Sequence, residues 1–239
     1  MNPRRSRLLM GGMALALTLA CGLPSFQPTP TAEPTSVPTE TATPVPAATA
    51  TPDTPYIFFR DDFSDPASGW DRATFPNGVT DYGNSSYRIT ALGPGQFLWS
   101  TPNLDLVDVR LRVTAKWVDG DADNAFGVVC RHVNEDNFYV LMVTSDGFAG
   151  IRRRLNGGEL ETLTGEGSFT RIRGLPHGGN VRLMAKCVGT TLSLFANEQL
   201  LLETEDDALA HGDVGVAASV FDAASATVDF YGFSVEVIP

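Results

Sequence analysis

The chain has 239 residues, with 17 basic and 28 acidic side chains and a formal net charge of −11. This acidity argues against nucleic-acid binding, which needs a basic face, and mainly favours solubility. The length allows one or two domains, but residues 1–56 do not have the composition of a globular protein. Residues 57–239 are therefore expected to form a single domain, which is long enough to bury a substantial core.

Residues 1–20 have the form of a secretory signal peptide. A basic start is followed by an apolar run over residues 8–20, which is too short to span a bilayer about 30 Å thick. The ending LTLAC at residues 17–21 resembles the lipobox of bacterial lipoproteins, although Thr18 stands where Leu is commonest. The resemblance implies that Cys21 carries diacylglycerol, becomes the new N-terminus and anchors the exported chain to the outer face of a bacterial membrane. The alternative is an ordinary secreted protein.

The segment 22–55 contains nine Pro, nine Thr and no Lys or Arg. Such a composition cannot bury enough apolar surface to fold, so residues 21–56 are predicted to be a disordered linker. Proline favours the extended polyproline conformation, and the segment would reach about 100 Å if fully extended. We interpret it as a spacer between a membrane and the domain.

The first strands of the domain are separated by turn residues. An entry strand is expected over residues 56–63, a loop rich in Gly, Asn and Asp follows Phe75, and strands are expected over 86–92 and 96–100. Residues 107–118 are predicted to form the longest strand. Its odd-numbered positions from Val109 to Trp117 are apolar and its even-numbered positions are mostly basic, so one of its faces should be wet.

Residues 125–155 predict an antiparallel meander. Three apolar segments, at 125–133, 137–144 and 148–155, are joined by the tight polar turns NED and SDG. Alternation places Cys130 on one face of the sheet and Arg131 on the other. A meander needs a second sheet to cover its apolar face.

The remaining sequence supplies further strands. They are expected at 159–163, 180–188, 190–197, 198–203, 213–220 and 225–238, with a long loop over 165–179. About a dozen short strands, without an amphipathic helix of ten or more residues, predict an all-β protein. The architecture expected is a two-sheet antiparallel β-sandwich of the jelly-roll type.

Four segments carry a family resemblance. Residues 126–151, 180–207, 211–219 and 226–235 come in the same order as the strands of concanavalin A-like, laminin-G-like jelly rolls of the 3-keto-disaccharide hydrolase (glucanase-like) branch. The resemblance covers nearly all of residues 60–237 and implies a concanavalin A-like fold. That family includes sugar hydrolases and many non-catalytic sugar-binding or adhesion modules, so the resemblance leaves the activity open.

Cys130 and Cys187 are predicted to form a disulfide. Both lie in the middle of apolar strands, and export implies an oxidising compartment in which two cysteines tend to pair. The alternative is two separate buried thiols. Neither cysteine has a neighbouring His or a cationic neighbourhood that would lower its pKa, so a catalytic role is not expected.

Acidic residues gather in three places. The run from Glu203 to Asp207 lacks the apolar residues between the acids that a glucanase-type E-x-D-x-E strand has, and it is interpreted as a solvated turn. The oxygens of Asp119, Asp121, Asp123 and Asn124 alternate as calcium ligands do, but the rest of an EF-hand loop is missing. Calcium at this loop, or at a similar group formed by Asp61, Asp62 and Asp65, is one hypothesis; an ordinary polar turn is the other. No other cofactor is expected.

Sugar binding needs an aromatic face for the pyranose ring and polar groups for its hydroxyls. The residues that could supply these are the aromatics Trp99, Trp117, Tyr139 and Tyr231 and the polar residues Arg131, Asn137 and Arg152. Trp117 is in phase with Val113 and is expected to belong to the core instead. Arg152 and Arg154 share a strand face and either hold an acidic glycan or block strand pairing as a charged edge.

These observations favour a cell-surface lipoprotein whose jelly-roll domain binds carbohydrate or another envelope component without catalysis. A glycoside hydrolase of the 3-keto-disaccharide type is the first alternative, with its acids spread over loops. A structural or adhesive module that contacts protein is the second.

Overall fold

The computed structural model describes residues 54–175 and 178–239. The expected signal peptide, Cys21 and nearly all of the expected linker lie outside these residues. No helix in the part of the chain that the structure describes is long and apolar enough to cross a membrane. The described helical structure is one 3₁₀ turn, η1 (Gly165–Gly167).

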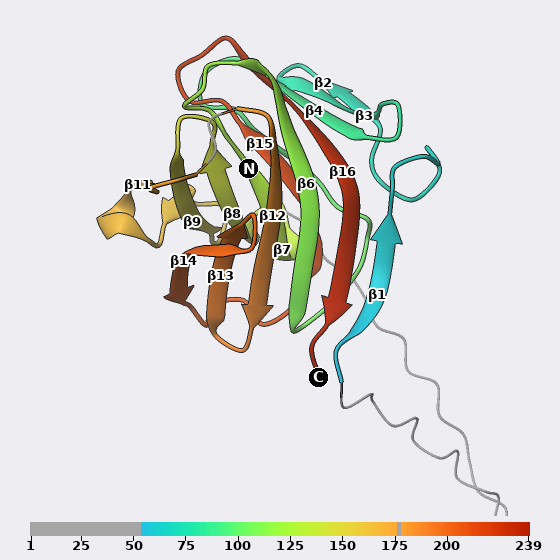
Figure 1. The fold of residues 1–239 in the computed structure, drawn as a ribbon, viewed down its shortest axis with the longest axis vertical. Helices are drawn as coiled ribbons and strands as arrows, with labels where there is room; N and C mark the ends of the chain where they lie inside the picture. The colour runs from blue at the N-terminus through green and yellow to red at the C-terminus, as the bar shows by residue number, and fades with distance from the viewer. Residues whose placement is uncertain (1–53, 176–177) are drawn as a thin grey trace, which may run out of the picture. The chain divides into compact units, whose positions relative to one another are not determined.

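The strands form two antiparallel sheets packed face to face, as Figure 1 shows. The first sheet has nine strands in the order β14-β13-β12-β6-β16-β4-β3-β2, and β1 pairs with the second half of β16. Its strands are β1 (Tyr56–Asp61), β2 (Ala73–Phe75), β3 (Gly78–Tyr82), β4 (Tyr87–Leu92), β6 (Val109–Gly120), β12 (Asn180–Val188), β13 (Thr191–Ala196), β14 (Gln199–Glu205) and β16 (Ser225–Val237).

The second sheet has seven strands in the order β10-β9-β8-β7-β15-β5, and β11 also pairs with β9. Its strands are β5 (Phe97–Ser100), β7 (Ala125–Asn134), β8 (Asn137–Thr144), β9 (Phe148–Arg154), β10 (Glu161–Thr162), β11 (Thr170–Arg171) and β15 (Asp213–Ser219). The predicted meander is therefore β7-β8-β9, at the centre of this sheet. The prediction of an all-β, two-sheet antiparallel sandwich is confirmed.

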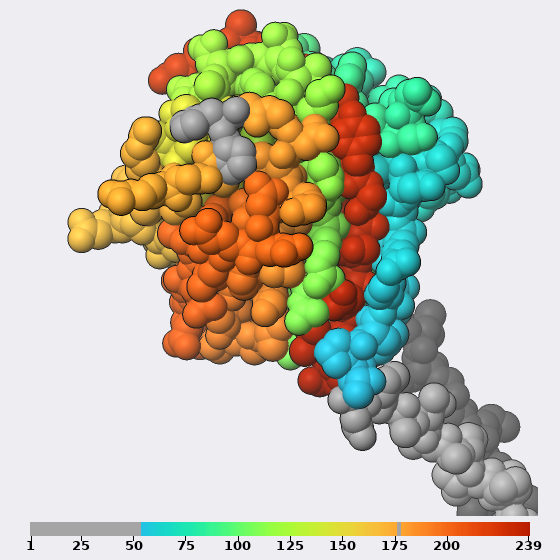
Figure 2. Space-filling model, viewed as in Figure 1, coloured from blue at the N-terminus to red at the C-terminus, as the bar shows by residue number. Residues whose placement is uncertain are grey.

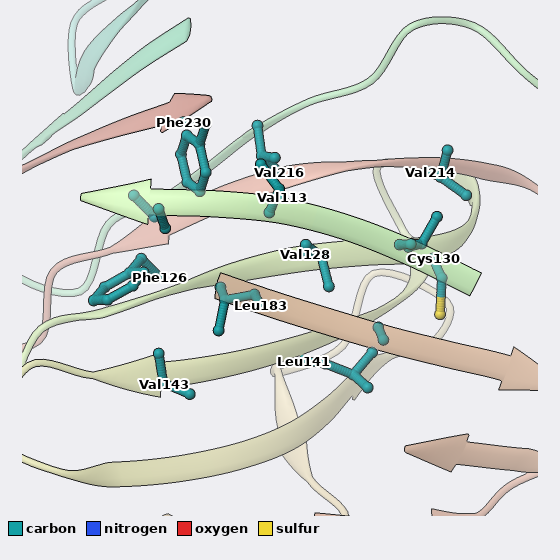
Figure 3. Packing of buried hydrophobic residues seen from close by; sticks show 14 of the residues in the cluster. Val113, Phe126, Val128, Cys130, Leu141, Val143, Leu183, Val214, Val216 and Phe230 are labelled. Atoms are coloured by element: carbon teal, nitrogen blue, oxygen red, sulfur yellow. The ribbon is translucent and has the colours of Figure 1, made fainter. Parts of the chain in front are cut away.

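The main core lies between the two sheets. Figure 3 shows Phe126, Val128 and Cys130 of β7 pointing toward Val113 of β6 and Leu183 of β12. Period-two alternation on both sheets brings these side chains into one layer, and each of them is nearly inaccessible to solvent. The space-filling view in Figure 2 shows β6, β16 and β1 side by side on the opposite, solvent-facing surface of the nine-stranded sheet.

Two expectations about strands were wrong. The loop expected after Phe75 contains strand β3, because Gly78 and Gly83 supply the turns and Thr80 faces Ile89 across the β3-β4 ladder. Its residues GVTDY lack an apolar alternation that would mark a strand. The longest strand is β16, with 13 residues, and not β6, with 12; β16 bends through register shifts and pairs with three neighbours.

A bulge in β7 changes which side chain faces which way. The register of β7 with β8 shifts between Cys130 and Asn134, and Arg131 has φ = 50°. Such a bulge breaks the period-two alternation of the strand. Arg131 turns inward and is only 2% exposed, whereas His132 takes the place on the outer surface that alternation had assigned to Arg131.

Arg131 and the disulfide close one end of the sandwich. The Arg131 guanidinium donates to the carbonyl oxygens of Leu209 (2.9 Å) and Gly189 (2.6 Å) and lies 3.3 Å from the Asp108 carboxylate. Its neighbour Cys130 is bonded to Cys187 of the facing sheet, with Cα atoms 6.8 Å apart. The predicted disulfide is confirmed, and it joins the two sheets directly.

Asp61 fixes the segment that follows the entry strand. Its buried carboxylate accepts hydrogen bonds from the Phe63 amide (2.7 Å), the Ser68 hydroxyl (2.5 Å) and the Trp70 indole (2.9 Å). The Trp70 ring packs against Phe233 at 4.9 Å between centroids. This network determines where the chain emerges at Asp71, which is a residue of the candidate site described below.

We predict that replacing both Cys130 and Cys187 by Ala lowers the free energy of unfolding by up to about 4 kcal/mol, because the bridge closes a long loop in the unfolded chain. The two cysteines are 57 residues apart. Urea unfolding followed by tryptophan fluorescence measures the change. The wild-type protein, unfolded under reducing conditions, should unfold at the same urea concentration as the double variant. An unchanged midpoint in both experiments would contradict the role of the bridge.

Candidate functional site

The seven-stranded sheet is apolar on both faces. The face turned away from the main core, called here the outer face, carries a second buried cluster. Half-buried aromatic side chains from β5 and from the loops pack over this cluster and form its solvent-facing surface. The buried members are Ala125, Val129, Phe138, Val140, Met142 and Ala217, and the side chains over them are Phe97, Trp99, Leu160, Phe169 and Phe221.

Four aromatic rings converge at the β5 end of the outer face. Phe97 stacks on Trp99 (5.4 Å between centroids) and lies parallel to Phe138 at 5.5 Å. His132 lies 5.7 Å from Trp99 and 5.8 Å from Phe138. The two positions of the sheet next to Trp99 in the same row are the small residues Ala217 and Gly127, which leaves room for the large rings.

The Trp99 ring is held in place by His132. The Trp99 indole nitrogen donates a 2.9 Å hydrogen bond to His132 Nε2, so this nitrogen carries no proton. Burial lowers the pKa of His132, and the carboxylates of Asp213 and Glu135 oppose that shift only in part. Because the indole N–H is already used, Trp99 presents its ring face rather than a donor to a ligand.

A pocket of about 500 Å³ opens beside Trp99. This volume lies within the usual range for small-molecule sites. A second hollow of about 430 Å³ shares Thr101, Asn103 and His132 with it. The first pocket is lined by the apolar side chains of Phe75, Phe97, Leu98 and Trp99 and by the polar residues Asp71, Asn77, Thr101, Asn103, His132 and Glu135.

The polar wall of this pocket is fixed by hydrogen bonds outside the pocket. The Asp71 amide donates to the Ser100 hydroxyl at 3.3 Å, and the Tyr87 hydroxyl donates to the Asp71 carbonyl. The Asn77 amide donates to Gln96 at 2.8 Å. These contacts hold the backbone at Asp71 and orient Asn77, so the wall is preformed.

The part of the pocket lining formed by the loop at Asn103 depends on a buried acid. Asp213 of β15 accepts from the backbone amides of Asn103 (2.8 Å) and Leu104 (2.9 Å). Asn103 itself has φ = 62°, a left-handed conformation that Asn tolerates better than most residues. Asp213 therefore positions the loop that borders both hollows.

Two arginines border the β9 side of the outer face. Arg154 lies directly opposite Phe138 in the β8-β9 ladder, with its guanidinium carbon 5.7 Å from the ring centroid. Arg152 lies 5.9 Å from the Phe169 ring and donates to the Leu160 carbonyl at 2.6 Å. Phe138 thus contacts both the Trp99 end and the arginine end of the outer face.

Of the residues proposed from the sequence as polar or aromatic ligand contacts, Trp99 and Arg152 lie on the outer face. Tyr139 and Arg131 do not, and both assignments need correction. Tyr139 is 0% exposed because it points into the main core. Its hydroxyl donates to Asp206 and accepts from the Leu209 amide, and burial raises its pKa to about 12. Arg131 is removed from the surface by the bulge in β7.

The remaining candidates are used in turns or lie elsewhere. Asn137 donates to Asn134 (2.9 Å) and accepts from the Asn156 amide (3.0 Å), so it links two turns. Trp117 packs partly buried against the main core beside Phe126, as expected. Tyr231 lies on the outside of the nine-stranded sheet, far from the seven-stranded one in the fold.

Among the described residues, no group of three or more His, Cys, Asp or Glu side chains is arranged so that it could hold a metal ion. The acidic segments therefore form no metal site there. Asp119 is exposed near the end of β6, and Asp121 and Asp123 are exposed in the turn that follows. Asn124 is buried and accepts from the Phe221 amide at 2.8 Å. The run at 203–207 is not simply a solvated turn. Asp206 is partly buried and lies 2.5 Å from Arg153, because it faces the core side of β9.

Sequence reasoning placed Arg154 on one strand face with Arg152 but missed Phe97, Phe138 and His132 as parts of the same surface. Phe97 is in phase with Trp99, so alternation contained a signal for it. His132 was out of phase because of the bulge. Phe138 had no signal, because an apolar residue in a central strand is normally assigned to the main core.

We predict that acid weakens the contribution of His132 to folding. Its pKa is lowered in the folded protein, so the unfolded chain binds the proton more readily. The stabilisation is therefore complete above about pH 6.5 and is lost as the pH falls below this toward the lowered folded value. Urea unfolding of the wild type and His132→Gln between pH 5 and 8 tests this. The wild type should have the higher free energy of unfolding at pH 8, and its difference from the variant should shrink toward pH 5. A difference that stays constant over this range would contradict the assignment.

No family model matches the chain, and no curated protein matches it. Solved structures do resemble it. Carbohydrate-binding module CBM66 from Bacillus subtilis aligns with a TM-score of 0.53 and 16% identity over 69% of this chain and 92% of that one. A Bacillus subtilis protein of unknown function with a galectin-like fold aligns with a TM-score of 0.54 and 10% identity over 77% and 97%.

An enzyme domain is similar to the same extent. The catalytic domain of an endo-1,3-β-glucanase (laminarinase) from Thermotoga petrophila aligns with a TM-score of 0.53 and 9% identity, over 77% of this chain and 98% of that domain. At these identities the similarity concerns the fold. The chain has the jelly-roll sandwich that is found in carbohydrate-binding modules and in glycoside hydrolases.

Proposed function

We propose that the domain binds carbohydrate on the outer face of the seven-stranded sheet, with the Trp99 pocket as the centre of the site. The observation that carries this proposal is one half-buried indole, fixed by His132, in the wall of a preformed pocket that polar groups also line. An aromatic face covers the apolar face of a pyranose, and fixed polar groups orient its hydroxyls. The fold shared with carbohydrate-binding modules supports this choice.

A second candidate function is glycoside hydrolysis. Two carboxylates, those of Asp71 and Glu135, line the same pocket as Trp99. A glycosidase uses a pair of carboxyl groups that flank the scissile bond. The likeness to a laminarinase domain concerns the fold and does not favour either function. Both side chains are exposed, whereas a general acid is usually held in an environment that raises its pKa. Binding without catalysis is therefore the preferred proposal, with the 3-keto-disaccharide hydrolase activity as the alternative.

We further propose that the domain works outside the cell as part of a lipoprotein. The leader and the Cys21 motif support this, together with the Pro- and Thr-rich segment before Tyr56. A lipid anchor with a long spacer would hold a sugar-binding surface at a distance from the membrane. Contact with an envelope protein, without a sugar, is the remaining alternative.

We predict that Trp99→Ala weakens oligosaccharide binding about tenfold or more, since loss of aromatic stacking and its buried area removes on the order of 1.5 kcal/mol. Proton NMR of the purified protein with a panel of oligosaccharides and 3-keto-disaccharides, followed for a day, measures the effect by line broadening. Tyr231→Ala, an aromatic on the outside of the other sheet, is the matched control and should bind as the wild type does.

The same spectra separate the candidate functions. New anomeric signals that disappear in Asp71→Asn or Glu135→Gln would establish hydrolysis. Broadening without new signals supports binding alone. If no sugar in the panel broadens, carbohydrate recognition is wrong and the protein-contact alternative takes its place.

We predict that cells expressing the chain incorporate labelled fatty acid into it and that Cys21→Ala abolishes the labelling, because the thioether forms on that sulfur. Cell fractionation followed by detergent phase separation measures the anchoring. The double Cys130→Ala/Cys187→Ala variant is the control and should remain labelled. Label retained by Cys21→Ala would show that the anchor proposal is wrong.

A further inference from the structure

The three consecutive arginines of β9 have different electrostatic surroundings. Arg153 points to the core side and contacts the carboxylates of Asp206 (2.5 Å) and Glu161 (2.8 Å). Arg152 and Arg154 point to the outer face, and neither has a carboxylate of the described residues within 4.0 Å. Among the described residues, these two guanidinium groups therefore have no ion-pair partner within 4.0 Å, in a chain whose net charge is −11.

Both guanidinium groups are partly removed from water. Their Nε atoms are buried and have no acceptor among the described residues. Burial lowers the pKa of Arg152, the neighbouring charge of Arg154 lowers it further, and Glu159 opposes this only in part. Partial burial next to a like charge is unfavourable unless an anion is bound there, because the desolvated charges are not otherwise compensated.

Both arginines have N–H donors that no described residue uses and that a ligand could bind. Arg152 uses Nη2 for the Leu160 carbonyl, and Arg154 makes no hydrogen bond to a described residue. Each group packs near a ring, Phe169 or Phe138, which restricts its orientation. Restricted, planar guanidinium groups match the two oxygens of a carboxylate better than a point charge does.

Charge is distributed unevenly across the outer face. Asp71 and Glu135 line the pocket at the β5 end, whereas Arg152 and Arg154 lie at the β9 end. Arg171 extends the basic end, since its guanidinium lies 5.4 Å from the ring of Phe148 on β9. A ligand with a carboxylate would be repelled from the pocket end and attracted to the arginine end.

We propose that the ligand is an acidic oligosaccharide, one that contains uronic acid residues, with a neutral part of the chain on Trp99 and a carboxylate at Arg152 and Arg154. This inference rests on the proposed sugar-binding function and specifies the ligand class for the same site. Phe138, which contacts Trp99 and Arg154, lies beneath the path between the two ends.

Calorimetry with matched ligand pairs tests the proposal. The probes are oligosaccharides of galacturonate, glucuronate and mannuronate, each beside its methyl ester, which has the same backbone without charge. We expect at least one acid to bind about tenfold or more tightly than its ester, as charge-assisted bidentate contacts would give. The preference should shrink in 0.5 M salt, because screening weakens partly exposed charges.

Variants assign that preference to the two arginines. Arg152→Gln/Arg154→Gln should bind the acid no more tightly than the ester, and ester binding that persists in the variant, even if weaker, shows that the site is folded. Arg182→Gln/Lys186→Gln removes the same charge from the outside of the nine-stranded sheet and should keep the preference.

Each alternative result has a separate meaning. Esters that bind as tightly as the acids would overturn the proposal and leave sugar binding intact. Tighter binding of a sulfated oligosaccharide than of any uronate would overturn the assignment of a carboxylate. If neither acids nor esters bind, and no neutral sugar does, both this inference and the proposed function are wrong.

Discussion

The seven-stranded sheet has apolar side chains on both of its faces, and the rest of the molecule is arranged to cover them. The nine-stranded sheet covers one face and creates the main core. The other face, with Phe138, Val140 and Met142, would be an exposed apolar patch of the kind that marks an interaction surface or an aggregation risk. Aromatic side chains from β5 and the loops cover it instead. The candidate site consists of these covering side chains, which explains why it is rich in aromatics.

One bulge determines the composition of that site. Without the register shift after Cys130, Arg131 would lie on the outer face and His132 would point inward. With the shift, Arg131 binds the carbonyls of Leu209 and Gly189 at the end of the sandwich, next to the disulfide. His132 becomes the acceptor for Trp99. The same local distortion therefore stabilises one end of the fold and orients the ring on which a sugar would stack.

The three consecutive arginines of β9 differ in their ion-pair partners, and this difference separates a structural arginine from two candidate ligand contacts. Asp206 and Glu161 neutralise Arg153, and Asp206 also accepts from Tyr139, so these groups form a closed network beside the main core. Arg152 and Arg154, one residue away on either side, lie outside the network. Because β-strand side chains alternate, a run of three arginines serves two purposes at once.

The sequence by itself determined the all-β class and the central meander, and it predicted the pairing of Cys130 with Cys187. The arrangement of leader, linker and domain stays a prediction. Hydrophobic alternation and turn residues are local signals, and they suffice for strands and for a fold class. Residue type suggested Trp99 and Arg152 as ligand contacts, and both lie on the outer face.

Only the tertiary structure decided which outward residues meet. β8 is apolar on both faces, so alternation alone does not show that Tyr139 belongs to the main core and Phe138 to the outer face. The pocket joins Asp71, Trp99, His132 and Glu135 from separate segments, and no spacing in the sequence encodes their proximity. Register shifts and the covering of a second apolar face depend on contacts between distant strands, and these become visible only when the sheets are assembled.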